Sequence, residues 1–145
     1  MSKKITILGC GYLGKKLASS CLELGWEVSA FTRNEATASE LTCLGVDHVV
    51  TGKLEERGWH NQIDGGQDYI VNCVGASSPT LDGYQQSYLQ GMKSVRAWLS
   101  SQQDFTFIFT SSTSVYPQCD GEVVDEKSSH EKVSARGQIL LDAED

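Results

Sequence analysis

The chain has 145 residues and a formal net charge of −7, with 39% hydrophobic and 21% charged side chains. A chain of this length buries roughly two-thirds of the surface that it exposes when unfolded, so we expect one soluble globular domain, residues 1–145. No apolar run approaches the roughly 20 residues of a membrane span, and no cluster of Lys and Arg could neutralise the phosphates of a nucleic acid.

The first third of the chain alternates apolar runs with helical periodicity, which is typical of a parallel α/β sheet. The opening apolar run is too short for a signal peptide, so we expect a cytoplasmic protein. Strands are predicted over 5–8, 27–32 and 48–51, and helices over about 13–24 and 35–44. Gly25 and Gly45 stand where the cap glycines of helix C-termini belong. Residues 54–63 predict an irregular or briefly helical crossover.

The remaining chain continues the alternation. Strands are predicted over 69–74 and 105–110, helices over about 83–101 and 134–145, and a polar loop over 111–130. The long helix has an apolar stripe at helical spacing, made of Tyr84, Tyr88, Met92, Val95 and Leu99. We therefore predict an α/β fold, a doubly wound parallel sheet of Rossmann type with five strands present and the sixth missing.

Cysteines and histidines give no sign of a metal site. The five cysteines are odd in number and form no CxxC pair, so we interpret them as reduced and mostly buried thiols. They are Cys10, Cys21, Cys43, Cys73 and Cys119. The three histidines are scattered, without HxH or HxxxH spacing, and we interpret them as structural or surface residues. They are His48, His60 and His130.

A glycine loop follows the first predicted strand directly and opens the first predicted helix. Residues 9–14, GCGYLG, match GxGxxG in the context that this motif requires. Gly9 permits a tight turn, Gly11 lets a pyrophosphate approach the backbone, and Gly14 lets the helix pack close to the strand. We predict that the loop, with Tyr12 and Leu13, binds a dinucleotide at the helix N-terminus. A glycine-rich turn without a ligand is the alternative.

The end of the second predicted strand bears on the choice of cofactor. Domains that prefer NAD place Asp or Glu there to bind the ribose 2′-hydroxyl, but this chain has Thr32, Arg33 and Asn34. Arg33 can bind a 2′-phosphate through charge-assisted hydrogen bonds. We therefore predict NADP(H) rather than NAD(H); a solvated surface Arg33 is the alternative.

Two segments carry a family resemblance. Residues 107–117, FIFTSSTSVYP, resemble the fifth-strand segment of extended short-chain dehydrogenases/reductases, the branch of the nucleotide-sugar epimerases and dehydratases. Residues 72–76, NCVGA, resemble that family's turn after strand four. The resemblance implies cofactor contacts at Val74, Gly75, Ala76 and Ser111. It also implies that the sheet is truncated before its sixth strand and a substrate domain, so that the chain is an N-terminal portion.

The resemblance implies an incomplete catalytic set. Ser112 takes the place of the active-site serine, whose hydroxyl binds the reacting oxygen of the substrate. The family's general acid/base is a Tyr, whose pKa is lowered by a Lys four residues later, but Arg136 and Leu140 stand in those places. Arg136 could only stabilise an oxyanion electrostatically, which leaves Tyr116 as the fallback proton donor.

Two further positions depart from the family pattern. The family's usual GxxGxxG would need a glycine where Leu8 stands, and Lys53 replaces an Asp that contacts the adenine ring in the family. These departures resemble the atypical members of the family, whose active sites are poorly kept.

Three functions follow. The first is an NADP-dependent oxidoreductase or nucleotide-sugar-modifying enzyme with a degenerate site, acting on a nucleotide sugar or a small carbonyl compound. The second is a non-catalytic NADP(H)-binding module or redox sensor, and the third is a remnant with neither role. The resemblance also implies a homodimer through the helices after strands four and five. Tyr84, Tyr88 and Trp98 could serve its interface; packing of these residues against the sheet is the alternative.

Overall fold

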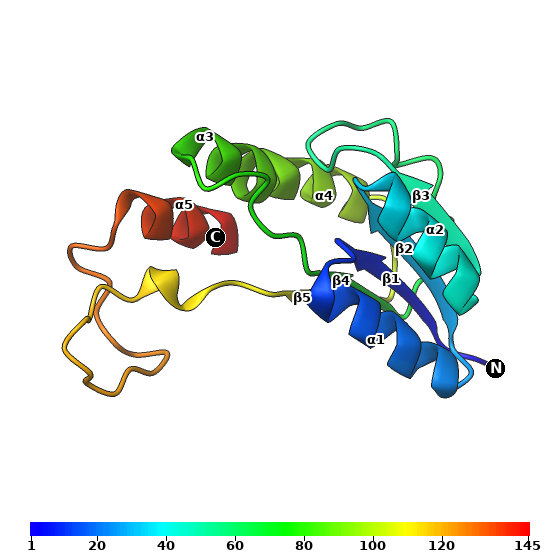
Figure 1. The fold of residues 1–145 in the computed structure, drawn as a ribbon, viewed down its shortest axis with the longest axis horizontal. Helices are drawn as coiled ribbons and strands as arrows, with labels where there is room; N and C mark the ends of the chain where they lie inside the picture. Colours follow the sequence, from blue (N-terminus) through cyan, green and yellow to red (C-terminus); the bar gives the residue numbers. More distant parts are fainter.

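Five parallel strands form a single sheet in the computed structural model, which describes residues 1–145 (Figure 1). The strands are β1 (Lys4–Leu8), β2 (Glu27–Thr32), β3 (His48–Thr51), β4 (Tyr69–Asn72) and β5 (Thr106–Phe109), in the order β3-β2-β1-β4-β5. The helices are α1 (Tyr12–Glu23), α2 (Glu35–Leu44), α3 (Leu81–Tyr84), α4 (Gly91–Leu99) and α5 (Ala135–Glu144), with a π-helical segment η1 (Gln85–Gln90) and a 3-10 turn η2 (Thr113–Val115). The order reverses between β1 and β4, which confirms the predicted doubly wound sheet.

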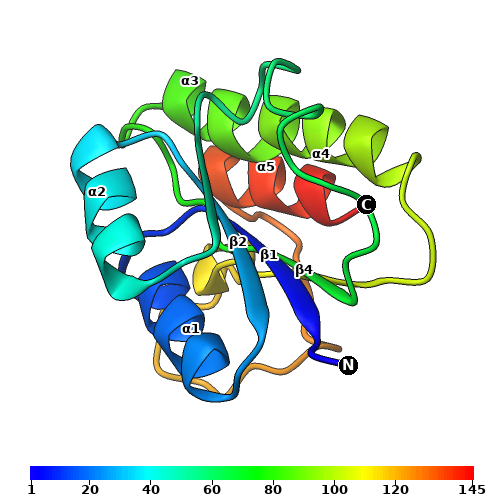
Figure 2. The same ribbon diagram turned by 90° about the vertical axis from the view of Figure 1, so that its right-hand side faces the viewer.

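Helices cover both faces of this sheet (Figure 2). Successive side chains of a strand point to opposite faces, so neighbours on β1 belong to different cores. Ile7 packs with Leu41 in the core under α1 and α2. Leu8 packs with Val95 and Trp98 in the core under α4. The two cores fix the sheet between its helical layers and leave the carboxyl ends of the strands to form the site.

Local signals place the ends of the first two helices. The side chain of Asn34 accepts a hydrogen bond from the Thr37 N–H at 3.0 Å and caps α2. Gly45, with φ of 97°, closes the same helix, and Gly25, with φ of 73°, follows α1. The predicted bounds of β2, α2 and β3 are confirmed to the residue.

The predicted helix over 83–101 is instead three helical segments, because the π-helical turns of η1 interrupt it. The π turn shifts the buried face, so that Gly83, Ser87 and Gly91 are buried while Tyr84 and Tyr88 are only half-buried. Met92 and Val95 of the predicted stripe are buried in the core, Tyr88 and Leu99 pack against it partly buried, and Tyr84 does not belong to it.

The strand predicted over 69–74 ends at Asn72. The buried side chain of Asn72 accepts a hydrogen bond from the N–H of Val74 at 3.0 Å. This local bond turns the chain out of the sheet, because it satisfies an amide that the strand ladder would otherwise have to pair.

The crossover between β3 and β4 has no regular secondary structure, as its weak pattern predicts. Trp59 nevertheless anchors it, being only 2% exposed. Its ring lies 5.2 Å from that of Trp98 and 5.3 Å from that of Phe31, and its N–H donates to the Leu54 carbonyl at 3.1 Å. The crossover therefore covers the sheet as a helix would.

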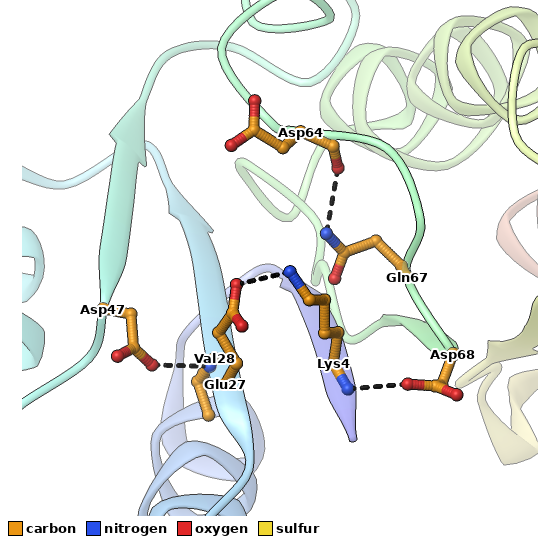
Figure 3. A network of polar contacts seen from close by, with 7 residues as sticks. All are labelled: Lys4, Glu27, Val28, Asp47, Asp64, Gln67 and Asp68. Carbon is orange, nitrogen blue, oxygen red and sulfur yellow. Dashed lines mark hydrogen bonds and ion pairs between the residues drawn. The ribbon is translucent and has the colours of Figure 1, made fainter. Parts of the chain in front are cut away.

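Charged side chains join the strands at their amino ends (Figure 3). The Lys4 ammonium lies 2.9 Å from the Glu27 carboxylate, and the Lys4 N–H donates to Asp68 at 2.8 Å. Asp47 accepts from the N–H of Val28 at 2.8 Å. Hydrogen bonds from the Lys4 N–H and from Lys3 hold the pKa of Asp68 below its usual range. None of the helices combines the length and the apolar character needed to cross a membrane.

Candidate functional site

A cavity of about 330 Å³ lies at the carboxyl edge of the sheet, where the segments that follow β1, β2, β3 and β4 meet. Its walls include Gly9 and Gly11 after β1, Arg33 after β2, Glu55 after β3 and Val74 after β4. Ligands of doubly wound sheets bind at such a reversal of strand order, because the two neighbouring connections leave on opposite faces. The cavity combines residues from both halves of the sheet.

The three loop glycines have different surroundings. A Cβ on Gly9, whose φ is 87°, would lie 2.6 Å from the backbone nitrogen of Val74. A Cβ on Gly14 would lie 2.2 Å from the carbonyl oxygen of Gly9. A Cβ on Gly11 would meet nothing within 4 Å, although Gly11 lines the cavity. Gly9 and Gly14 are thus required by the fold, whereas Gly11 keeps open a space that a ligand can enter.

The N-terminus of α1 faces this open space. Gly11 precedes the helix without a side-chain cap, and the first turn contains no acidic residue. Lys15 is the first residue whose N–H bonds within the helix, to the Gly11 carbonyl at 3.0 Å, so the preceding amides are free for an anion. Tyr12 and Leu13 can reach a ligand here only through these amides, because the two residues are 92% and 52% exposed and neither lines the cavity.

The far end of the cavity is built from the residues after β2. Thr32, Arg33 and Asn34 all line it, as the sequence predicts, together with Thr37 of α2. The Arg33 side chain is exposed and takes part in no ion pair. Its guanidinium is therefore available to an anionic ligand.

Glu55 is a wall residue that the sequence analysis does not identify. It lines the cavity from the segment after β3, beside the buried Leu54. Lys53 is not in the wall; its ammonium lies 3.4 Å from Glu56. Glu55 could have been found from its place, four residues beyond the end of the third strand, because the carboxyl ends of parallel strands share one edge.

The segment after β4 closes the remaining side. Val74 and Gly75 line the cavity, and Ala76 does not. Ser87 of η1 also lines it, and its hydroxyl accepts a hydrogen bond from the Ser77 N–H at 2.8 Å. The sequence analysis does not identify Ser87, which lies in the π-helical segment η1 and is buried there.

Two thiols lie in the same walls. Burial raises the pKa of Cys10 to about 12, with a smaller effect from neighbouring Cys73. Burial also raises the pKa of Cys73, against a hydrogen bond with Thr110 that lowers it. Both groups stay protonated at neutral pH, so neither is a nucleophile.

A second hollow, of about 390 Å³, lies beyond the end of β5. Its lining contains Ser111, Ser112, Tyr116, Glu126, His130 and Glu144. The Ser112 hydroxyl accepts from the Ser114 N–H at 3.2 Å and caps η2. The Ser111 hydroxyl donates to the Glu144 carboxylate. Ser111, predicted at the cofactor, thus lies in this hollow with two of the predicted catalytic residues.

Arg136, the third predicted catalytic residue, lines neither hollow. Its guanidinium donates to the Pro79 carbonyl and lies 5.5 Å from the centre of the Tyr84 ring. Leu140, four residues on, is completely buried. The structure therefore brings Ser112 and Tyr116 together and places Arg136 elsewhere. No group of three or more His, Cys, Asp or Glu side chains is arranged to hold a metal ion.

Known proteins resemble the chain over nearly its whole length. Residues 5–137 match the model of the NAD dependent epimerase/dehydratase family. Protein YeeZ of Escherichia coli K12 is 26% identical over 144 residues, which are 99% of this chain and 52% of that protein. The chain thus spans about half the length of the curated relatives that it matches.

Solved structures show the same fold. A short-chain dehydrogenase/reductase superfamily protein from Agrobacterium tumefaciens with bound NAD aligns with a TM-score of 0.80 and 20% identity, covering 97% of this chain and 43% of that one. A UDP-galactose 4-epimerase aligns with a TM-score of 0.79 and 20% identity, covering 97% of this chain and 49% of that one.

Proposed function

Since the chain belongs to the NAD dependent epimerase/dehydratase family, we propose that it binds NADP(H) in the cavity between the glycine loop and Arg33. We further propose that it acts as an oxidoreductase or a nucleotide-sugar-modifying protein. A bound nicotinamide would supply or accept a hydride there. The residues that would hold the dinucleotide are those of the glycine loop, the end of β2 and the turn after β4.

One observation carries the proposal: a single cavity is lined both by the glycine loop, where the first amides of α1 are free, and by Arg33, whose guanidinium is in no ion pair. Gly11 leaves room where a side chain would stand, and the N-terminus of α1 favours negative charge at that place. Arg33 lies in the same cavity. A dinucleotide with its pyrophosphate at the loop and a phosphate on its ribose suits both ends.

The preference for NADP(H) depends on charge. No carboxylate stands at the end of β2 to receive a free 2′-hydroxyl, whereas Arg33 suits a 2′-phosphate. Glu55 acts in the opposite sense, because its carboxylate lines the same cavity and repels a phosphate. We propose that Arg33 outweighs it, since an arginine forms charge-assisted bonds directly to phosphate.

Titration of NADPH and NADH against the wild type and Arg33→Ala tests this balance. The wild type is expected to bind NADPH more tightly, and Arg33→Ala to lose roughly 10- to 100-fold in NADPH affinity, the equivalent of one lost charge-assisted hydrogen bond of about 1.5–3 kcal/mol. NADH affinity should stay within about twofold. Arg57→Ala, an exposed arginine outside the cavity, is the matched control. Equal wild-type affinities would refute the preference, and absence of binding to either would refute the cofactor.

The set of side chains that would catalyse a reaction with the cofactor lacks the family's Tyr/Lys pair. We propose that Ser112 holds the reacting oxygen of a substrate, because its hydroxyl lies in a hollow at the carboxyl edge of the sheet. Tyr116 lines the same hollow. Arg136 instead donates a hydrogen bond to the Pro79 carbonyl and packs on the Tyr84 ring. Arg136 is thereby less suited to the catalytic role predicted for it.

A non-catalytic NADP(H)-binding module or redox sensor is the second candidate. The buried Leu140 favours it, because an apolar side chain there cannot lower the pKa of a neighbouring acid/base. Oxidation of NADPH with small carbonyl compounds and nucleotide sugars separates the two candidates. Tight NADPH binding without turnover of any of them would support the module.

A further inference from the structure

We propose that His130 is the proton-transferring side chain of the second hollow, in the role that the missing Tyr/Lys pair would have. The inference rests on the proposed function, because it assigns a donor to the reaction of a cofactor-bound protein. It concerns a histidine that sequence spacing alone marks only as a surface or structural residue.

The position of His130 is the first support. It lines the same hollow as Ser112, and its ring lies 5.5 Å from that of Tyr116. The tilt of 52° between these rings is a packing geometry that holds the imidazole against the wall. A group held by Ser112 would therefore lie in a space that the imidazole also borders.

The hydrogen bonds of the three histidines are the second support. The Nε2 atom of His48 is hydrogen-bonded to the Gln62 carbonyl, and the Nε2 atom of His60 is hydrogen-bonded to the Ser94 hydroxyl at 2.9 Å. No side chain or backbone group of the chain bonds to the ring nitrogens of His130, which is half-buried. Its proton is thus free for a ligand, while those of the other two are engaged by the fold.

Charge in the hollow is the third support. The other ionisable groups that line this hollow are Tyr116, Glu126 and Glu144, and the neighbours of His130 in sequence include Glu131 and Lys132. The lining contains no Lys or Arg. His130 is therefore the basic side chain that lines the hollow together with Ser112. Histidine also changes its charge between pH 5 and 8, which Arg136 does not.

The hollow lies at the same edge of the sheet as the cofactor cavity. Ser111 follows β5 at once, and the preceding Thr110 donates its N–H to the Asn72 carbonyl at 3.0 Å. Asn72 ends β4, and Cys73 to Gly75 form a wall of the cavity. Figure 1 shows η2 and α5 beyond this edge. The segments that follow β4 and β5, which line the cavity and the second hollow respectively, therefore begin side by side.

The step balances with a carbonyl substrate and a reduced nicotinamide dinucleotide. Hydride addition to the carbonyl carbon moves the C=O π pair onto the oxygen at Ser112. The N–H bond of the His130 imidazolium then breaks, an O–H bond forms, and neutral imidazole remains. Solvent returns the proton to the ring, so one hydride and one proton convert one carbonyl to one alcohol.

NMR of the histidine rings in the full chain gives a readout independent of turnover. The positive charge of oxidised nicotinamide should lower the pKa of His130 in the NADP⁺ complex relative to the NADPH complex. His48 and His60 should show a smaller difference and serve as internal controls. An equal His130 pKa in both saturated complexes would overturn the proposal, whereas failure of both cofactors to bind would instead refute the proposed function.

Turnover of carbonyl compounds with NADPH is the second arm. His130→Gln should lower kcat by roughly 10²- to 10⁴-fold, the usual contribution of a general acid, and leave NADPH affinity unchanged. The matched control, His48→Gln, should keep full turnover. A smaller loss than that of Tyr116→Phe would overturn the proposal, as would absence of turnover in wild type that binds NADPH.

Discussion

In the glycine loop, some glycines are required by the packing of the fold and another leaves room for a ligand. Gly9 and Gly14 are fixed by contacts with backbone atoms, which cannot withdraw as a flexible side chain can. Gly11 has no such neighbour. The motif GxGxxG therefore contains two structural positions and one that depends on the ligand, a distinction that the sequence pattern alone does not make.

Substitution of these glycines should show the difference. Gly14→Ala is expected to destabilise the fold by about 1–3 kcal/mol, because its Cβ overlaps the Gly9 carbonyl. Gly11→Ala should leave stability nearly unchanged and weaken NADPH binding by roughly tenfold or more, because the methyl group fills the ligand's space. Urea unfolding and cofactor titration measure the two effects. Gly58→Ala, exposed and free of neighbours, should change neither.

Other residues of the site could be predicted only in part. Arg33 was accessible to sequence reasoning because a strand and a capped helix, both readable from local patterns, fix its place. Glu55 and Ser87 were not, since Glu55 lies in an irregular crossover and Ser87 in a π-helical segment. Neither feature has a periodicity that a sequence reveals.

At the scale of elements, the crossover between β3 and β4 carries more of the core than its weak pattern suggests. Trp59 packs between Phe31 of the sheet and Trp98 of α4. Strand and helix positions could be predicted because alternation and caps are local, but this contact joins residues far apart in the chain. The extra length predicted for β4 has a similar cause, since the bond from Val74 to Asn72 competes with the ladder.

Trp59→Ala is expected to destabilise the protein by about 3–5 kcal/mol, the usual effect of removing a large buried aromatic side chain. Trp59→Phe should be much milder, because it keeps most of the packed volume. Thermal unfolding followed by circular dichroism measures both. A loss below about 1 kcal/mol for Trp59→Ala would contradict the anchoring role.

On the scale of the whole molecule, the two edges of the sheet have different tasks. Ion pairs and hydrogen bonds of Lys4 and Asp68 join the amino edge (Figure 3), while the carboxyl edge holds both hollows. The homodimer stays a prediction, and the structure reduces the number of aromatic residues that could form its interface. Trp98 is buried in the core, so it is unavailable to a partner, and Tyr84 is half-buried beneath Arg136.

Cofactor binding should stabilise the whole molecule. A ligand at 100 times its Kd that binds only the folded state adds about 2.7 kcal/mol, which corresponds to a rise in Tm of roughly 5–10 °C for a chain of this size. We expect this rise with NADPH and a smaller one with NADH at equal concentration. Differential scanning fluorimetry measures it, and an unchanged Tm with saturating NADPH would contradict binding to the folded state.

The contact of Arg136 with the Pro79 carbonyl and the Tyr84 ring has a thermodynamic consequence. It fastens the last helix, α5, to the segment between β4 and α3, whose first residues form a wall of the cavity. We therefore expect docking of α5 and occupancy of the cavity to be linked equilibria, and such linkage is reciprocal. If docked α5 strengthens ligand binding by a certain free energy, the bound ligand stabilises the docked position of α5 by the same free energy.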